Sequence, residues 1–166
     1  MDRFVVIGID PASTKLAMVA LSSDGRYMTY YNGKLGKSGG QSCANAIRSV
    51  NSFVSSVQKK LGKVQYAFIE SPVVGRGGVR STMVQCFTSG AIQGALYESD
   101  ITTQVANVSS WKKTVIGKGN ATKEEVAEYI RLRWNDIFTT AGGNQDLIDA
   151  SCIALYGQHI VSRGMV

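Results

Sequence analysis

Two apolar segments of this chain end on a carboxylate, and that pattern limits the folds that the chain can adopt. Residues 3–10 contain "FVVIGID", which ends on Asp10, and residues 64–70 read "VQYAFIE", which ends on Glu70. Near-continuous apolar runs of this length are typical of strands buried on both faces of a sheet. Aspartate and glutamate are almost never fully buried unless they are paired or bind a metal ion. The two segments therefore predict buried strands that hold a carboxylate at the edge of the core.

The other elements alternate in the order expected of an α/β domain. Further strands are expected at residues 16–21, 26–32 and 102–108, and glycine-containing loops at 33–42, 72–80 and 115–121. Apolar residues spaced three and four apart predict helices at residues 41–61, 81–98, 122–134 and from about 144 onward. Thr122 and Glu125 form a capping-box signature. We expect one domain over residues 1–166, an α/β fold with a mixed sheet.

The charge and cysteine content favour a cytoplasmic protein with a polyanionic partner. The chain has 18 basic and 12 acidic residues, a net charge of +6, which is compatible with nucleic-acid binding. No apolar run approaches the ~20 residues that cross a bilayer, so no membrane span is expected, and the first residues lack a signal-peptide pattern. The 3 cysteines are widely spaced without a CxxC pair, which indicates reduced thiols and argues against structural zinc.

Two further carboxylates open the last predicted helix. Asp146 and Asp149 are three residues apart and so share one helix face. Taken singly, Asp10 and Glu70 are compatible with turn residues, and Asp146 with a partner of the helix dipole. If the four converge, however, they repel one another strongly unless a cation lies among them. Oxygen ligands select Mg²⁺, with Mn²⁺ as a substitute, and such a cluster can hold two ions that hydrolyse a phosphodiester.

Several motifs resemble those of the RuvC family of Holliday junction resolvases. They are "IGIDPAST" on the first strand, "FIES" on the fourth, "WKKTVIGKGNATKEEV" in the middle and "NQDLIDASCIALYG" near the end. Their order and spacing are similar to the family's, and together they span almost the whole chain. The resemblance implies a ribonuclease H-like fold, a five-stranded mixed sheet with helices on both faces. It also implies a homodimer that binds a four-way DNA junction and nicks two strands at symmetric positions.

The resemblance also implies roles for single residues. By motif position, the family's metal-binding catalytic carboxylates match Asp10, Glu70, Asp146 and Asp149. Lys123 matches a basic position that contacts phosphates or stabilises developing charge, and it joins the catalytic set. Contacts with the DNA backbone are assigned to Lys112, Lys113 and Lys118 of the same segment. Arg76 and Arg80 flank two glycines after Glu70, and this loop is either a DNA contact or an ordinary solvated loop.

Two departures from the bacterial pattern make the chain more similar to phage-encoded members of the family. Bacterial members carry an aromatic residue shortly after the strand-four glutamate, where this chain has Val73 and Val74. The loop before the last helix reads "TTAGGNQ" and lacks the usual basic or histidine character. A phage-encoded protein of this kind would work in the cytoplasm of its bacterial host.

The tryptophans and one helix are open to more than one interpretation. Trp111 and Trp134 are more often core or interface residues than platforms for stacked bases. The broad apolar face of helix 81–98 is either simply buried or partly a dimer surface, with Met83 and Phe87 facing the partner.

Three alternatives to a junction resolvase are considered. A less specific nuclease of the same fold would cut branched DNA or RNA–DNA hybrids, and the missing aromatic residue keeps this possibility open. A junction-binding protein without catalysis is disfavoured, because a binder of polyanions gains nothing from an acidic pocket. An actin-like ATPase, whose first strand begins similarly, needs a second lobe for which 166 residues leave no room.

Overall fold

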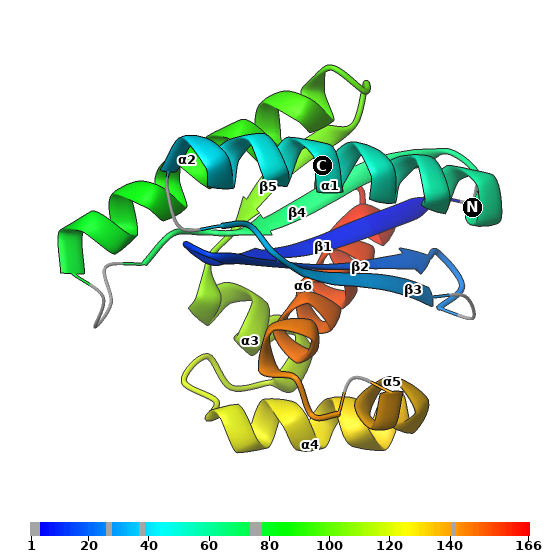
Figure 1. The fold of residues 1–166 in the computed structure, drawn as a ribbon. Coiled ribbons are helices and arrows are strands. Elements are labelled where there is room, and N and C mark those ends of the chain that lie inside the picture. The colour runs from blue at the N-terminus through cyan, green and yellow to red at the C-terminus, as the bar shows by residue number, and fades with distance from the viewer. Residues whose placement is uncertain (1–3, 26–27, 37–38, 74–77, 141) are drawn as a thin grey trace.

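The computed structural model describes residues 4–25, 28–36, 39–73, 78–140 and 142–166. Its centre is a sheet of five strands in the order β3-β2-β1-β4-β5 (Figure 1). The strands are β1 Val5–Pro11, β2 Lys15–Ser22, β3 Met28–Lys34, β4 Val64–Glu70 and β5 Thr102–Ala106. β1, β2 and β3 pair antiparallel, whereas β4 pairs parallel with β1 and with β5. The mixed sheet expected from the sequence is therefore confirmed.

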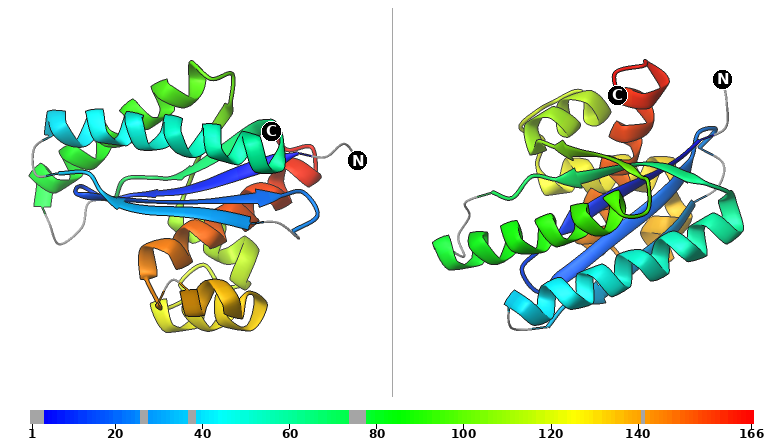
Figure 2. Two further views of the ribbon diagram at one scale, coloured as in Figure 1. Left: turned by 45° about the vertical axis from the view of Figure 1, so that its right-hand side comes forward. Right: turned by 90° about the horizontal axis from the view of Figure 1, so that it is seen from above.

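Helices cover both faces of this sheet, and each face has its own core (Figures 1 and 2). One face carries α1 Gly39–Leu61 and α2 Gly78–Tyr97. The other carries α3 Val108–Ile116, α4 Lys123–Arg133, α5 Asn135–Thr140 and α6 Gln145–Ser162. The side chains of the strands alternate between the two cores, so that Ile7 and Ile9 of β1 face α1 and α2, and Val6 faces α6. None of the described helices combines the length and apolar character needed to cross a bilayer.

Helix α6 lies unusually close to the central strands, and two glycines permit this. A Cβ atom on Gly8 of β1 would lie 2.2 Å from the backbone nitrogen of Ala154 and 2.3 Å from the backbone oxygen of Ala150. A Cβ atom on Gly157 of α6 would lie 2.3 Å from the ring of Phe68 in β4. Real Cβ atoms do not come this close to other heavy atoms, so any larger residue at these two positions would force the neighbouring atoms to shift. The first turns of α6 are thereby held beside the end of β1.

The structure corrects several boundaries. The predicted strand 102–108 ends at Ala106, because the Asn107 side chain accepts a hydrogen bond from the Ser109 amide and starts α3. Helix α3 was not predicted, and it includes Val115 and Ile116, which were expected in a loop. It ends at Gly117, whose φ of 89° is readily adopted by glycine. The capping box at Thr122 and Glu125 is confirmed.

Other differences lie at the ends of elements. β3 runs to Lys34, since Gly33 and Lys34 pair with Leu16 and Lys15 of β2 and do not belong to the following loop. α1 and α2 begin at Gly39 and Gly78, before the expected starts at 41 and 81, so Arg80 is helical. The short helix α5 was not predicted.

Candidate active site

Asp10 and Glu70 lie at the ends of neighbouring parallel strands. Ile9 of β1 is paired with Ile69 of β4, so the next residue of each strand, a carboxylate, comes to the same edge of the sheet. β1 is buried from Val5 to Ile9 and β4 from Ala67 to Ile69, and both acidic residues are half-buried. The strand pattern predicted from the sequence is thus what brings these two side chains together.

Helix α6 brings the other two carboxylates to the same place. Its N-cap Asn144 accepts a hydrogen bond from the Leu147 amide at 3.1 Å, which fixes where the helix starts. Asp146 and Asp149 follow in its first turns and are half-buried. Since α6 crosses β1 at Gly8 through Ala150 and Ala154, its N-terminal end lies next to Asp10.

The electrostatics of the four carboxylates show that they form one group. Burial raises the pKa of Asp10 well above its usual range, and the negative charges of the other three carboxylates raise it further. Burial also raises the pKa of Glu70 to about 7, and the charge of Asp149 adds to this shift. The pKa of Asp149 is raised too, first by burial. Like charges held together in a partly buried site are unfavourable without a cation.

Neighbouring side chains hold three of the carboxylates. The indole N–H of Trp111 donates to Oε1 of Glu70 at 2.9 Å. The amide of Gln145 donates to Oδ1 of Asp149 at 2.9 Å, and Lys15 Nζ lies 3.7 Å from Oδ2 of Asp146. The Asp10 side chain makes no hydrogen bond to any described residue, and its backbone pairs with Ala17 of β2.

The chemistry of this site fits a hard divalent cation. The donors are carboxylate oxygens, which suit Mg²⁺ and Mn²⁺. The raised pKa values of Asp10 and Glu70 reflect burial first and the negative charge of neighbouring carboxylates second. Within the described residues no three acidic, histidine or cysteine side chains are close enough together to hold an ion as they stand. Binding an ion would therefore require some of these side chains to change conformation.

The predicted basic residues occupy different positions around this site. Lys123 lies near enough for its charge to lower the pKa of Asp10 and Asp149, and Lys112 has the same effect on Glu70 and Asp149. Lys118 instead forms an ion pair with Glu125 at 2.7 Å.

For two other predicted basic residues, the described part of the chain shows no contact with the carboxylates. Lys113 and Arg80 are exposed on α3 and α2, respectively. Arg76 lies outside the described residues.

Three residues that contact the carboxylates were not predicted. Gln145 precedes Asp149 by four residues, the spacing of side chains on one helix face, so the sequence could have indicated it. Lys15 and Trp111 meet their carboxylates only through the fold, and Trp111 is 41 residues from Glu70. Trp111 was expected to be a core or interface residue, and the structure places it in the core, because only 1% of its surface is exposed.

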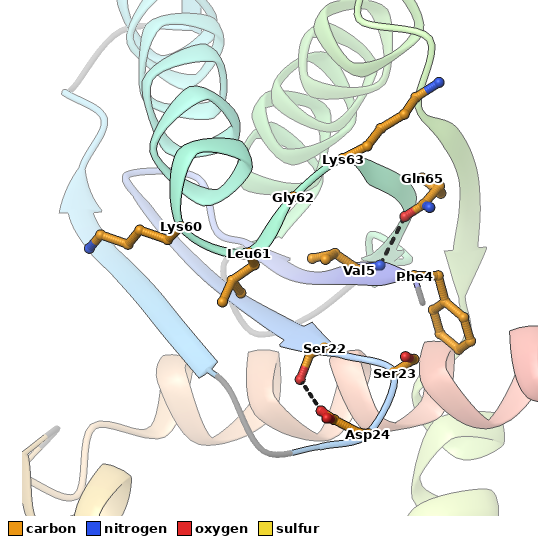
Figure 3. Close-up of a pocket in the computed structure, with 10 residues that line it drawn as sticks. All are labelled: Phe4, Val5, Ser22, Ser23, Asp24, Lys60, Leu61, Gly62, Lys63 and Gln65. Carbon is orange, nitrogen blue, oxygen red and sulfur yellow. Dashed lines mark hydrogen bonds between the residues drawn. The ribbon is translucent and has the colours of Figure 1, made fainter. Parts of the chain in front are cut away.

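A separate cavity of about 310 Å³ lies at the opposite end of the sheet (Figure 3). Phe4 and Val5 at the start of β1 line it, together with Lys60 and Lys63. Two hydrogen bonds border it, from Ser22 to Asp24 and from the Val5 amide to Gln65. None of the four carboxylates lines this cavity, so it is not part of the site.

Comparison with known proteins agrees with this arrangement. RuvC proteins of Rickettsia bellii and Rickettsia prowazekii, both named crossover junction endodeoxyribonuclease, are 28% and 27% identical to this chain over 153 residues. The match covers 90% of this chain and 94% of each relative.

Two solved structures share the fold. RuvC of Thermus thermophilus superposes with a TM-score of 0.72 at 19% identity, over 97% of both chains. The same protein in complex with a Holliday junction substrate superposes with a TM-score of 0.76 at 21% identity, over 97% of this chain and 96% of that one. The ribonuclease H-like fold implied by the sequence resemblance is thereby confirmed.

The model of one protein family, described as crossover junction endodeoxyribonuclease RuvC, matches residues 6–156. The match contains all four carboxylates, the three helices between β5 and α6, and α6 itself as far as Tyr156. Fold, carboxylate placement and family match agree: the chain belongs to the RuvC family of crossover junction endodeoxyribonucleases.

Proposed function

We propose that this protein resolves four-way DNA junctions by metal-dependent hydrolysis of phosphodiesters. The observation that carries the proposal is the convergence of Asp10, Glu70, Asp146 and Asp149 from three elements into one negatively charged site. The net charge of +6 on the whole chain supports a polyanionic substrate around that acidic site. A cytoplasmic location is consistent with Cys43, Cys86 and Cys152 forming no disulfide.

The four carboxylates would hold Mg²⁺, two ions per site, with Mn²⁺ as a substitute. Bound divalent ions supply an activated water and stabilise the leaving oxygen of the phosphodiester. The chain's own part is to fix the carboxylates at the strand ends and to exclude bulk water beneath them with the apolar core. Cleavage of this kind leaves a 5′-phosphate and a 3′-hydroxyl.

Two lysines beside the carboxylates would contribute positive charge. Lys123, the first residue of α4, lowers the pKa of Asp10 and Asp149, so its ammonium group is close enough to act on a phosphate bound there. We assign it to stabilising charge that develops during the reaction. Lys112 is tied to the Ala121 carbonyl at 2.7 Å and supports the same region of positive potential.

The enzyme would act as a homodimer with α2 at the interface. Val79, Met83 and Phe87 follow one another at four-residue spacing on α2 and are 71%, 51% and 57% exposed. A stripe of large apolar side chains in the solvent is unfavourable for a monomer and suits a self-complementary two-fold interface. Paired nicks on a junction need two sites, and one copy of this chain offers one.

The proposal is tested with four substrates. Purified protein is incubated with a synthetic four-way junction, a Y-fork, a linear duplex and an RNA–DNA hybrid, with Mg²⁺ and then with EDTA. Paired symmetric nicks on the junction in Mg²⁺, and none in EDTA, are expected. Comparable cutting of forks or hybrids would instead indicate the less specific nuclease. The exposed Val73, where bacterial members carry an aromatic residue, is compatible with that outcome. Junction binding without cleavage in either Mg²⁺ or Mn²⁺ would contradict the enzyme.

A further inference from the structure

The contact between Trp111 and Glu70 joins the hydrophobic core to the acidic site. Trp111 is among the largest fully buried side chains, and its only polar atom, Nε1, donates to Oε1 of Glu70 at 2.9 Å. A buried indole N–H normally finds an acceptor, and most such acceptors have no part in chemistry. Here the acceptor is one of the four proposed metal ligands, so the hydrogen bond links the core directly to a functional group.

The indole ring itself is held from several sides. Helix α3 is capped at both ends, by the Asn107 side chain and by Gly117, and the Trp111 amide donates to the Asn107 carbonyl at 3.0 Å. The ammonium group of Lys112 lies 5.6 Å from the centroid of the Trp111 ring, within the range of a cation–π interaction. The same ammonium group donates to the Ala121 carbonyl, which fixes its own position. The ring therefore has little freedom to move away from Glu70.

The strand that carries Glu70 is anchored to the start of α3. The amide of Ser71, directly after Glu70, donates to the carbonyl of Ala106 at 2.9 Å. Ala106 ends β5, and Asn107 caps α3 directly after it. This hydrogen bond brings the backbones of residues 70 and 111 into a fixed relation across 41 residues of sequence.

We propose that Trp111 is a positioning residue that orients the Glu70 carboxylate for metal binding; this inference rests on the metal site proposed above. The indole N–H engages one carboxylate oxygen and leaves Oε2 for the cation. Because an indole is a donor only, it cannot itself compete as a ligand. Gln145, which contacts Asp149, has an acceptor oxygen as well and is only half-buried, so it does not act in this purely orienting way.

If Trp111 had only a structural role, its replacement would not change metal affinity in particular, and the second tryptophan of the chain is a matched control. Trp134 is the only other tryptophan, stacked under Arg133 at 5.4 Å. Removing a hydrogen-bond partner of a metal ligand commonly weakens metal affinity by about 10-fold or more. Trp111→Phe should therefore weaken Mn²⁺ binding, measured by titration calorimetry, by about 10-fold, and Trp134→Phe should leave it unchanged. Junction binding in EDTA should be the same in both variants.

Two measurements separate positioning from packing. In ¹⁵N-labelled protein the indole N–H signal of Trp111, assigned with Trp134→Phe, should shift on Mg²⁺ addition while that of Trp134 stays in place. In the Trp134→Phe background, β-(3-benzothienyl)alanine at position 111 keeps the shape of tryptophan but has no N–H. This analogue should reproduce the loss of Mn²⁺ affinity without a loss of thermal stability, even if Trp111→Phe proves too unstable to study.

The outcomes distinguish this inference from the function on which it rests. If the wild-type protein binds Mn²⁺ and the analogue binds it equally well, Trp111 does not position Glu70 and the inference is overturned. If the wild-type protein binds no Mn²⁺, the proposed metal site fails, and the role of Trp111 fails with it. An unshifted Trp111 signal at saturating Mg²⁺ would likewise contradict the positioning role.

Discussion

Helices α6 and α2 lie on opposite faces of the sheet and meet the strands in different ways. Of the 18 residues of α6, ten are buried. Gly8 of β1 and Gly157 of α6 let the backbone of α6 approach β1 and β4 closely. Of the 20 residues of α2, only five are buried, and all of them lie between Thr88 and Leu96. Figure 2 shows the N-terminal part of α2 extending beyond the sheet.

The apolar residues of the two helices therefore serve different purposes. In α6 the apolar residues serve the fold of one chain, and they fix Asp146 and Asp149 beside β1. In the first half of α2 the large apolar side chains have no partner within the described chain, as the exposure of Met83 and Phe87 shows. Changes on the α6 side should therefore alter stability and chemistry in a single copy, and changes on the outer face of α2 should alter association.

The largest expected effect is on the chemistry beside α6. Asp10→Asn removes a carboxylate whose pKa is raised by burial and by the charges of the other three. It should reduce junction cleavage by about 10³-fold, because loss of metal-held charge stabilisation amounts to several kcal/mol. Junction binding should be retained. Asp100→Asn, the same change at an exposed residue with φ of 54°, is the control and should cleave normally. Unchanged cleavage in Asp10→Asn would remove Asp10 from the site.

A charge on the outer face of α2 should act on association only. Phe87→Glu places a carboxylate in the apolar stripe and should weaken dimerisation at least ~100-fold, measured by sedimentation velocity, since two copies would bury like charges. On a plasmid-borne cruciform, the product should change from linear DNA to a nicked circle. Leu132→Glu on α4, where the leucine is 72% exposed, should leave the dimer intact. A stable Phe87→Glu dimer would refute α2 as the interface.

The same substitution in the two helices should have opposite effects on stability. Gly157→Ala places a methyl group 2.3 Å from the buried ring of Phe68. The resulting overpacking outweighs the gain in helix propensity, so the free energy of unfolding should fall by about 1–2 kcal/mol. In Gly94→Ala the added methyl group faces open space on α2, so the free energy of unfolding should rise by up to about 1 kcal/mol. Urea unfolding of both variants measures the difference, and a destabilised Gly94→Ala would mean that α2 is already covered.

A pH dependence of similar size originates on the α6 side, since α2 contains no acidic residue. The pKa of Glu70 rises from 4.5 to about 7 on folding, so the folded state binds this proton more tightly than the unfolded state. Its contribution to stability is therefore complete below pH 4.5 and is lost as the pH rises through about 7. In EDTA, unfolding free energy should fall by on the order of 1–2 kcal/mol between pH 5 and pH 7.5.

Glu70→Gln is the control for this pH dependence. Glutamine can still accept the hydrogen bond from Trp111 but does not titrate. The free energy of unfolding of this variant should therefore change less steeply with pH than that of the wild type. Equal slopes in the two proteins would show that Glu70 does not carry the effect. Saturating Mg²⁺ should remove the decline in the wild type, because the cation compensates the negative charge.

Local signals were sufficient to predict most of the fold. The apolar runs that form β1 and β4 and the capping box at Thr122 are properties of short segments, and the structure has them where they were expected. The missed helix α3 has a local cause as well. Its start depends on the Asn107 side chain, which lies within the segment 102–108 that was predicted as a strand, so the helix cap was not recognised.

The sequence by itself determined the five strands and four of the six helices, and it placed a carboxylate at the end of two strands and two more at the start of a helix. It could do so because burial along one segment leaves a periodic pattern in that segment. Only the tertiary structure decided that α6 lies against β1, that Trp111 reaches Glu70, that Lys15 lies beside Asp146, and that half of α2 has no cover. These are contacts between distant segments, and they depend on shape complementarity at positions such as Gly8 and Gly157, which no single segment reveals.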